Sequence, residues 1–237
     1  MWWIGFSQYT FLVLPKSFKK NRYSKDVFFN GFKELKKVSI KVKDSVQLSG
    51  FLPAFFVYSM AVQTIMIVAT YFGNKEINWS GSDSTTGLII SILLIQLVAI
   101  GGAYAAAKLA KSYGNVQVLI GIHFIWIGVC IYAYFMQTPN DFYIAAFFVG
   151  LVMGAIQSLS RSTYSKMIPS SEKDTTSFFS FYDVTEKLGI VVGMLFYGII
   201  AQLTGSVRYS IIFLTVFFVI GVFLLLRIPK TIRSEKT

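Results

Sequence analysis

Six long apolar runs constrain this chain more than any other feature of the sequence. Each is close to the roughly 20 residues that an α-helix needs to cross a bilayer. We therefore predict six membrane helices, at residues 49 to 72, 84 to 107, 115 to 136, 142 to 168, 177 to 203 and 207 to 228. Composition agrees, because 54% of the residues are hydrophobic and only 14% are charged, whereas a soluble domain carries about a quarter charged residues.

The distribution of basic residues predicts how these helices are oriented. All but three of the 22 Lys and Arg residues lie in segments on one predicted side of the membrane. Lys75 and Arg208 lie on the other side, and Lys187 lies within a run. Because basic loops stay in the cytoplasm, both ends of the six-span block are expected there. The net charge of +11 thus indicates membrane topology, and we expect no nucleic-acid partner.

The segments outside the block have characters of their own. Residues 1 to 15 are aromatic and apolar, too short to span, and are predicted to be the end of a preceding transmembrane helix or an interfacial anchor. Residues 16 to 48 form a cytoplasmic linker with ten Lys or Arg residues. The six-helix domain covers residues 49 to 228, and residues 229 to 237 are predicted to be a cytoplasmic tail.

The basic linker also carries apolar residues at helical spacing. These residues are Phe28, Phe29, Phe32, Leu35 and Val38. The pattern predicts a basic amphipathic helix that lies on the cytoplasmic membrane surface and contacts anionic lipid. The alternative is a solvated linker with a few hydrophobic side chains.

Motifs for familiar enzyme chemistry are missing. The sequence contains no phosphate-binding loop, no H-E-x-x-H and no G-x-S-x-G motif, so we expect a protein that is not an enzyme and needs no metal or other cofactor. The single cysteine, Cys130, excludes an internal disulfide. His123, the single histidine, lies in the third run, where we expect a partnered or interface histidine, with proton relay as the alternative.

Four charged residues lie inside the fourth and fifth runs, where a charge is costly and commonly functional. They are Arg161, Asp183, Glu186 and Lys187. Arg161 and Asp183 are each about 10 Å from the cytoplasmic ends of their helices, so we predict an ion pair between them. Glu186 and Lys187 are about 5 Å deeper, and Lys187 is also within reach of Asp183 on the same helix. The cluster is either an ion-pair latch between two helices or the charged border of an aqueous cavity with a gating role.

Polar and small residues predict how the helices pack. Polar side chains in the first, second and fourth runs indicate a polar interior shared by those helices. Gly101 with Gly102, Gly150 with Gly154, and Gly189 with Gly193 indicate close helix contacts. The last run is apolar all round, and we expect lipid to surround most of it.

Several segments resemble the major facilitator superfamily. AKLAKSYGNVQVL resembles the G-x-L-A-D-R-x-G loop of that superfamily, although Lys111 stands where the loop usually has an acid and Ser112 where it has a base. QSLSRSTYSKMIP and FFSFYDVTEKLG resemble the vacuole-effluxer-like branch. WWIGFSQYTF is similar to the end of that branch's sixth span, and NGFKELKKV to its central linker.

The resemblance implies an all-α membrane protein whose six transmembrane helices form the C-terminal half of a twelve-span fold. The chain is therefore expected to be a fragment or truncated product. In that superfamily the first and fourth helices of a half line the cavity, which implies solute contacts for Tyr58, Gln63, Gln157 and Arg161. Asp183, Glu186 and Lys187 would lie on a flanking helix, as gating or ion-pair residues.

The implied function is that of a secondary-active permease for a small solute such as an amino acid, the class that fungal members of the branch release from the vacuole. Transport would proceed by alternating access and would need the missing N-terminal six-helix half or a second copy as partner. The alternative function is a non-transporting membrane scaffold or assembly protein that binds anionic lipid.

Overall fold

The computed structural model describes residues 8, 13, 26 to 79, 83 to 169, 172 and 174 to 228, with the side chains of residues 26 to 30 left out. The predicted N-terminal segment, apart from two isolated residues, and the predicted tail lie outside these ranges. The elements of the described ranges are all helices: α2 (Asp26–Asp44), α3 (Val46–Glu76), α4 (Ser84–Tyr113), α5 (Asn115–Phe135), α6 (Pro139–Met167), α7 (Thr175–Thr204) and α8 (Val207–Leu226).

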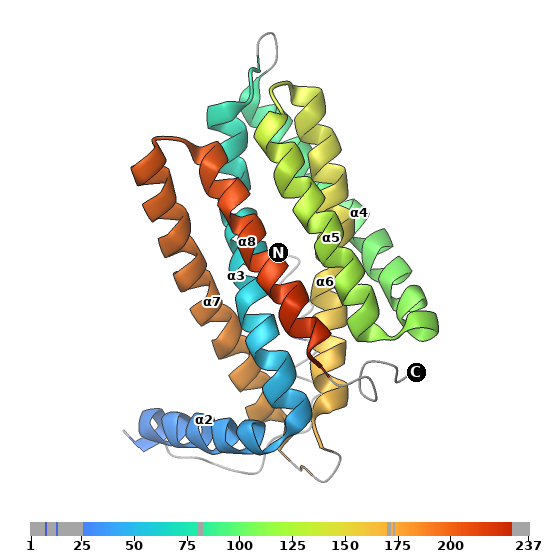
Figure 1. Ribbon diagram of the computed structural model, residues 1–237, viewed down its shortest axis with the longest axis vertical. Helices are drawn as coiled ribbons and strands as arrows, with labels where there is room; N and C mark the ends of the chain where they lie inside the picture. The colour runs from blue at the N-terminus through green and yellow to red at the C-terminus, as the bar shows by residue number, and fades with distance from the viewer. Residues whose placement is uncertain are drawn as a thin grey trace.

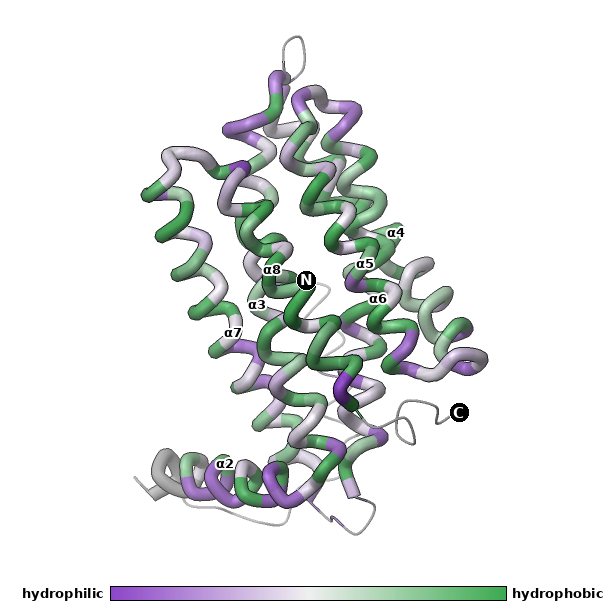
Figure 2. Tube along the Cα trace, viewed as in Figure 1, coloured by the Kyte–Doolittle hydropathy of each residue, from purple (hydrophilic) through white to green (hydrophobic). Residues whose placement is uncertain are grey.

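Helices α3 to α8 confirm the prediction of an all-helical protein with six helices long and apolar enough to cross a membrane. They run up and down in sequence order, joined by short connections (Figure 1). Hydrophobic residues cover the middle of all six helices, and hydrophilic residues gather at both ends of the bundle and on α2 (Figure 2). A further hydrophilic break lies in the lower half of α7.

Local sequence explains where the helices begin and end. Thr138 and Asp141 form a reciprocal capping box at the start of α6, and Asp174 accepts a hydrogen bond from the Ser177 backbone N–H at the start of α7. Between α4 and α5, Gly114 has φ +88°, a backbone conformation that glycine adopts without strain. Helix α3 begins at Val46, before the predicted start at residue 49, and Pro53 lies inside it.

Helix α3 is central to the bundle and packs against α8, α7 and α6. Its contact with α7 passes through Gly193, where an added Cβ would clash with the Met60 carbonyl and the Thr64 hydroxyl. On the other side, α4 packs closely on α6: a Cβ at Gly154 would meet the Ala99 carbonyl. The predicted small-residue contacts therefore form, except at Gly101, where nothing lies within contact distance.

The prediction that lipid would surround most of the last span is wrong. Helix α8 packs between α3 and α5, and Leu214, Phe218 and Leu225 are fully buried. The least covered helices are α4 and α7. Apolar side chains meet similar surroundings in lipid and between helices, so hydropathy does not distinguish these two positions.

Helix α2 lies across the lower end of the bundle, at a large angle to the six long helices (Figure 1). A helix thus occupies part of the predicted basic linker. Val38 and Val42 are buried against the bundle, and Lys41 forms a 2.6 Å ion pair with Glu172 between α6 and α7. Its location at a membrane surface stays a prediction.

Candidate functional site

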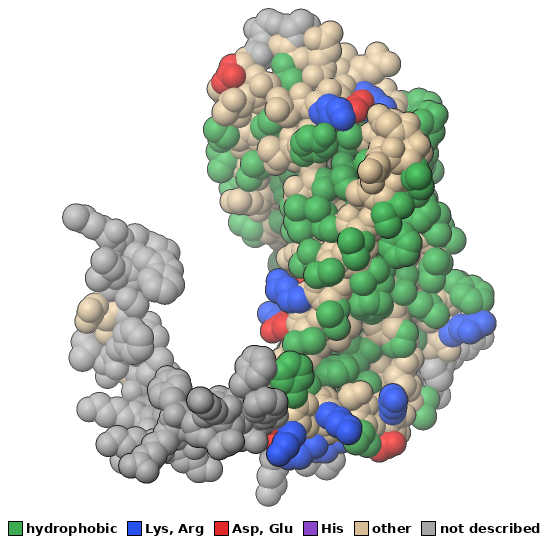
Figure 3. Space-filling view, turned by 90° about the vertical axis from the view of Figure 1, so that its left-hand side faces the viewer, with side chains coloured by type: hydrophobic (Ala, Val, Ile, Leu, Met, Phe, Trp, Pro, Cys, Tyr) green, Lys and Arg blue, Asp and Glu red, His purple; other side chains and the backbone are tan. Residues whose placement is uncertain are grey.

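A polar cavity of about 350 Å³ opens between α3, α6 and α7. In Figure 3 charged side chains interrupt the hydrophobic surface in the lower half of the molecule, on the side where α7 lies. The cavity is lined by Phe55, Tyr58, Ser59, Val62, Gln63, Ile156, Gln157, Ser160, Arg161, Tyr182, Glu186 and Lys187. A polar cavity inside an apolar bundle is suited to hold a polar solute.

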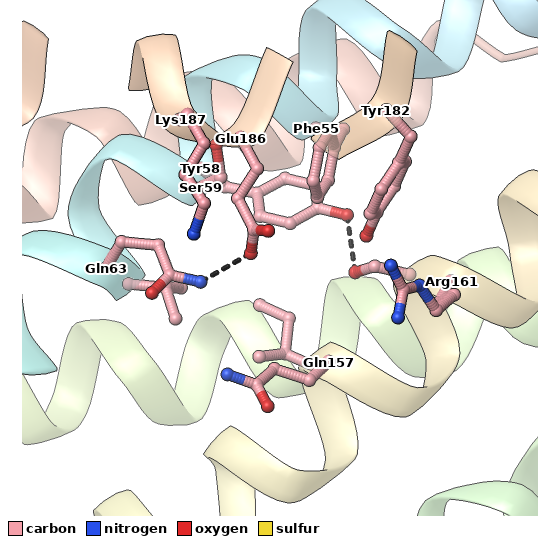
Figure 4. Close-up of a pocket in the computed structure, with 12 residues that line it drawn as sticks. Phe55, Tyr58, Ser59, Gln63, Gln157, Arg161, Tyr182, Glu186 and Lys187 are labelled. Atoms are coloured by element: carbon pink, nitrogen blue, oxygen red, sulfur yellow. Dashed lines mark hydrogen bonds between the residues drawn. The ribbon is translucent and has the colours of Figure 1, made fainter. Parts of the chain in front are cut away.

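Aromatic side chains form the lower wall of the cavity. The rings of Phe55 and Tyr182 stack with centroids 4.0 Å apart, joining α3 to α7. The Tyr58 and Ser160 hydroxyls lie 2.7 Å apart and hydrogen-bond across α3 and α6 (Figure 4). Both residues are buried, with Tyr58 1% and Ser160 2% exposed. This wall is therefore packed and preorganised.

Arg161 is paired but retains free donors. Its Nη2 donates to Asp183 Oδ1 at 2.7 Å, which confirms the predicted ion pair between the fourth and fifth spans. The guanidinium also lies 5.8 Å from the ring centres of Phe179 and Tyr182. Among the described residues only Asp183 accepts a hydrogen bond from Arg161, so most of its five N–H donors stay available.

The pair is not a buried latch. The side chains of Arg161 and Asp183 are 58% and 49% exposed. Counted from the observed ends of α6 and α7, they lie about 9 Å and 12 Å inside the bundle. Charges at such depth cannot face hydrocarbon without a large cost. Water, solute or another polypeptide must cover them.

Glu186 and Lys187 form the upper part of the cavity, one turn deeper than Asp183. Gln63 Nε2 donates to Glu186 Oε1 at 2.5 Å, which fixes one carboxylate oxygen, while the other has no hydrogen-bond donor among the described residues (Figure 4). The sequence placed Lys187 within reach of Asp183 on the same helix, but no ion pair joins these two residues. Asp183 pairs with Arg161 instead. The Lys187 ammonium and the Gln157 amide lie at the cavity with no hydrogen-bond partner among the described side chains.

His123 supports the cavity wall from behind. It is fully buried, its Nδ1 lies 2.7 Å from the Leu119 carbonyl, and its ring packs edge-on against Tyr58 with centroids 4.6 Å apart. Nε2 has no hydrogen-bond partner among the described residues. A backbone partner and an aromatic neighbour agree with the expectation of a partnered interface histidine.

The structure brings six of the seven predicted site residues to one cavity, and places Asp183 beside it, paired with Arg161. The prediction that the second span shares the polar interior is wrong: Ser91 donates to the Gly87 carbonyl of its own helix and Gln96 is exposed, away from the cavity. Helix α4 packs on the opposite side of α6. Helix α7, rather than α4, lines the cavity together with α3 and α6. Tyr182 of α7 and Phe55 of α3 also line the cavity, and the sequence analysis did not predict them.

A second arginine lies at the other end of the bundle. Arg208 at the start of α8 donates through Nε to Glu76 Oε2 at 2.7 Å and through Nη1 to the carbonyls of Tyr134 and Met136, both at 2.7 Å. Its Nη2 donates to the Glu76 carbonyl at 3.0 Å. These bonds join the ends of α3, α5 and α8.

The sequence of the chain is similar to known proteins of one family. The family model described as "Vacuole effluxer Atg22 like" matches residues 1 to 235. The chain belongs to the Atg22-like vacuole effluxer family. Its sequence is 34% identical over 210 residues to an uncharacterized MFS-type transporter, YxiO, of Bacillus subtilis, covering 88% of this chain and 47% of that protein.

Two fungal members of the Atg22-like family, both named autophagy-related protein 22, are also similar. The protein of Eremothecium gossypii is 31% identical over 184 residues, covering 73% of this chain and 35% of that protein. The protein of Saccharomyces cerevisiae is 26% identical over 223 residues, covering 89% of this chain and 37% of that protein. The chain thus spans between about a third and a half of the length of these relatives, and its six helices are consistent with one half of a major facilitator fold.

Proposed function

We propose that this chain forms the C-terminal half of a secondary transporter and that the cavity between α3, α6 and α7 binds the transported solute. One observation carries the proposal: Arg161 presents unused hydrogen-bond donors to a polar cavity inside a bundle of membrane helices. A cation with free donors at a cavity within the depth of the apolar helices binds an anionic group more strongly than an arginine on a fully hydrated surface would.

The proposed solutes are amino acids, because the cavity offers groups for both of their charges. Arg161 and Lys187 can contact a carboxylate, and Glu186 can accept a hydrogen bond from an ammonium group. The cavity volume of about 350 Å³ is enough for a small solute with some water. The aromatic wall of Phe55, Tyr58 and Tyr182 can pack against an apolar side chain.

The proposed partner is a further six-helix unit, either an N-terminal half or a second copy of the chain. The cavity opens beside half-exposed charges that cannot face lipid. Helices α4 and α7 are the least covered and provide apolar surface for such a unit, for example at Leu97 and Leu195, which are 69% and 59% exposed. Alternating access would then consist of rocking of the two units around the cavity.

The proposed orientation places the α2 end of the bundle in the cytoplasm. Described basic side chains at that end are Lys33, Lys36, Lys37, Lys41, Lys43, Lys108, Lys111, Lys166 and Arg227. The opposite end has only Lys75 and Arg208 among the described residues. This asymmetry is the pattern of the positive-inside rule. Labelling of single cysteines introduced at either end would test it.

Binding of chemically modified solutes tests the proposed recognition. The chain, reconstituted in liposomes alone or with the N-terminal half of the Bacillus relative, is assayed for counterflow and binding of radiolabelled amino acids. We expect the amide derivative, which lacks the carboxylate, and the N-acetyl derivative, which lacks the ammonium, each to compete at least tenfold more weakly than the parent amino acid. Arg161→Ala is expected to weaken binding of the parent amino acid, and Arg227→Ala, which removes an arginine outside the cavity, is its matched control and is expected to leave binding unchanged.

Equal competition by the parent amino acid and both derivatives would reject a role for the charged groups. Absence of binding and counterflow for every amino acid, with the helices intact, would reject the transport proposal for these solutes. It would favour the scaffold alternative if lipid-dependent partner binding persisted.

A further inference from the structure

Lys187 differs from the other charged residues of the cavity wall. Arg161 is paired with Asp183 and Glu186 is bound by Gln63, whereas Lys187 has neither an ion pair nor a hydrogen bond to the described residues. It lies about 18 Å along α7 from the first residue of that helix, near the middle of an apolar layer about 30 Å thick. An ammonium group at this depth is costly. A carboxylate that reaches Lys187 in another state of the protein would offset that cost.

Asp183 is the carboxylate best placed to reach Lys187. The two residues are four apart on α7, so their side chains lie on one face of the helix and can form an ion pair without a change of the backbone. Glu186 directly precedes Lys187, and consecutive residues of a helix do not face each other. Figure 4 shows the Lys187 side chain directed into the cavity beside Glu186, whose hydrogen bond runs to Gln63 instead.

The bond that now holds Asp183 can be exchanged. Arg161 donates to it through a single contact, from Nη2 to Oδ1, although an arginine and a carboxylate commonly meet through two parallel bonds. Both side chains are about half exposed, at the cavity. A solute carboxylate bound to the remaining donors of Arg161 brings a second negative charge close to Asp183, and the two carboxylates repel each other. By turning to Lys187, Asp183 would keep a cationic partner.

We propose that Lys187 is a positioning residue, which takes Asp183 over from Arg161 when a solute carboxylate binds. The inference rests on the proposed function, because the solute is the group that displaces Asp183. The exchange replaces an ion pair between α6 and α7 with one inside α7. Among the described residues, the hydrogen bond from the Tyr164 hydroxyl to the Phe178 carbonyl then remains as the polar contact between these two helices. Solute binding thereby loosens α6 from α7.

The test is a double-mutant cycle on amino-acid binding, in the same reconstituted preparations. Lys187→Met keeps the apolar part of the side chain and removes its charge. In the otherwise wild-type chain it should weaken binding about fivefold, because Asp183 must then leave Arg161 without reaching another cation. In the Asp183→Asn background the same substitution should change binding by less than about twofold, because no carboxylate has to move.

Two variants and one further measurement serve as controls. Lys187→Arg keeps the cation and should bind solute as the wild type does. Lys108→Met removes an exposed lysine near the end of α4 and should leave binding unchanged in both backgrounds. Thermal unfolding without solute should be the same for the wild type and Lys187→Met, since the described structure gives Lys187 no partner to lose. A lysine that only supports the fold would lower the unfolding temperature when it is replaced.

Two outcomes would overturn this inference and leave the proposed function intact. An equal loss of binding by Lys187→Met in both backgrounds would show that Lys187 contacts the solute itself. Unchanged binding by Lys187→Met in the otherwise wild-type chain would show that Asp183 does not need it. Failure of the wild type to bind any amino acid is a different result, and it would reject the proposed function and the exchange together.

Discussion

Two arginine–carboxylate pairs of this protein have the same separation and different surroundings. In Arg161–Asp183 and in Arg208–Glu76 the nitrogen and oxygen atoms are 2.7 Å apart, and each pair joins two different helices. The first pair is 58% and 49% exposed at a cavity, while both members of the second are 19% exposed. Distance alone therefore does not separate the two pairs.

The difference lies in how many donors each arginine has left. Arg208 uses its guanidinium on Glu76 and on the carbonyls of Tyr134 and Met136, so that it closes the ends of three helices. Arg161 donates to Asp183 and, among the described residues, to nothing else. A saturated arginine stabilises the fold, whereas an unsaturated arginine at a cavity can bind a ligand.

The largest expected effect is on stability, at the saturated arginine. Arg208→Ala leaves the Glu76 carboxylate and the carbonyls of Tyr134, Met136 and Glu76 without this donor, and breaking a largely buried pair of this kind costs about 3 kcal/mol. Reversible unfolding in detergent, compared with the wild type, measures this loss. A change below about 0.5 kcal/mol would show that the clamp contributes only as a surface pair does.

The next effect is on solute, at the unsaturated arginine. We expect Arg161→Ala to abolish transport and to weaken amino-acid binding about 100-fold, as for loss of a charged partner to a carboxylate. Stability should fall by less than about 1 kcal/mol, because the pair is exposed. Counterflow and unfolding measured on the same preparation check both. Normal transport, or a stability loss as large as that of Arg208→Ala, would remove the contrast between the two arginines.

Asp183→Asn has a smaller expected effect. The amide keeps a hydrogen-bond acceptor for Arg161 Nη2 but removes the charge that holds the guanidinium in place. We expect about tenfold slower transport with binding reduced less, because the arginine remains at the cavity. Counterflow rates and binding constants separate the two quantities. Activity equal to the wild type would limit Asp183 to helix packing.

The smallest effect is a pH dependence at the start of α7, the helix that carries Asp183. Hydrogen bonds from the Ser177 hydroxyl and then its backbone N–H, with a contribution from the charge of Lys41, lower the pKa of Asp174 below its ordinary value. The resulting stabilisation is present above the ordinary pKa of about 3.9 and is lost as the pH falls through the lower, folded-state pKa. The protection of the first-turn amides of α7 against hydrogen exchange, taken relative to the intrinsic exchange rate at each pH, should therefore fall at acidic pH, and Asp174→Asn should remove most of that dependence.

Much of the candidate site could be predicted from sequence because charges inside apolar runs are conspicuous. Depth along two antiparallel helices was sufficient to pair Arg161 with Asp183. Tyr182 and Phe55 were missed, since an aromatic residue in an apolar run carries no signal of facing a cavity. The polar residues of the second span were misplaced because Ser91 satisfies its hydroxyl within its own helix.

The sequence by itself determined the helical architecture: apolar runs of bilayer length must form helices, since no other open backbone satisfies its hydrogen bonds in lipid. It also determined the basic end and the four charges inside the spans. Only the tertiary structure decided which helices are central, which of two arginines is saturated, and that α7 rather than α4 completes the cavity. Apolar side chains face lipid and neighbouring helices with nearly equal free energy, so helix position depends on close packing at residues such as Gly154 and Gly193.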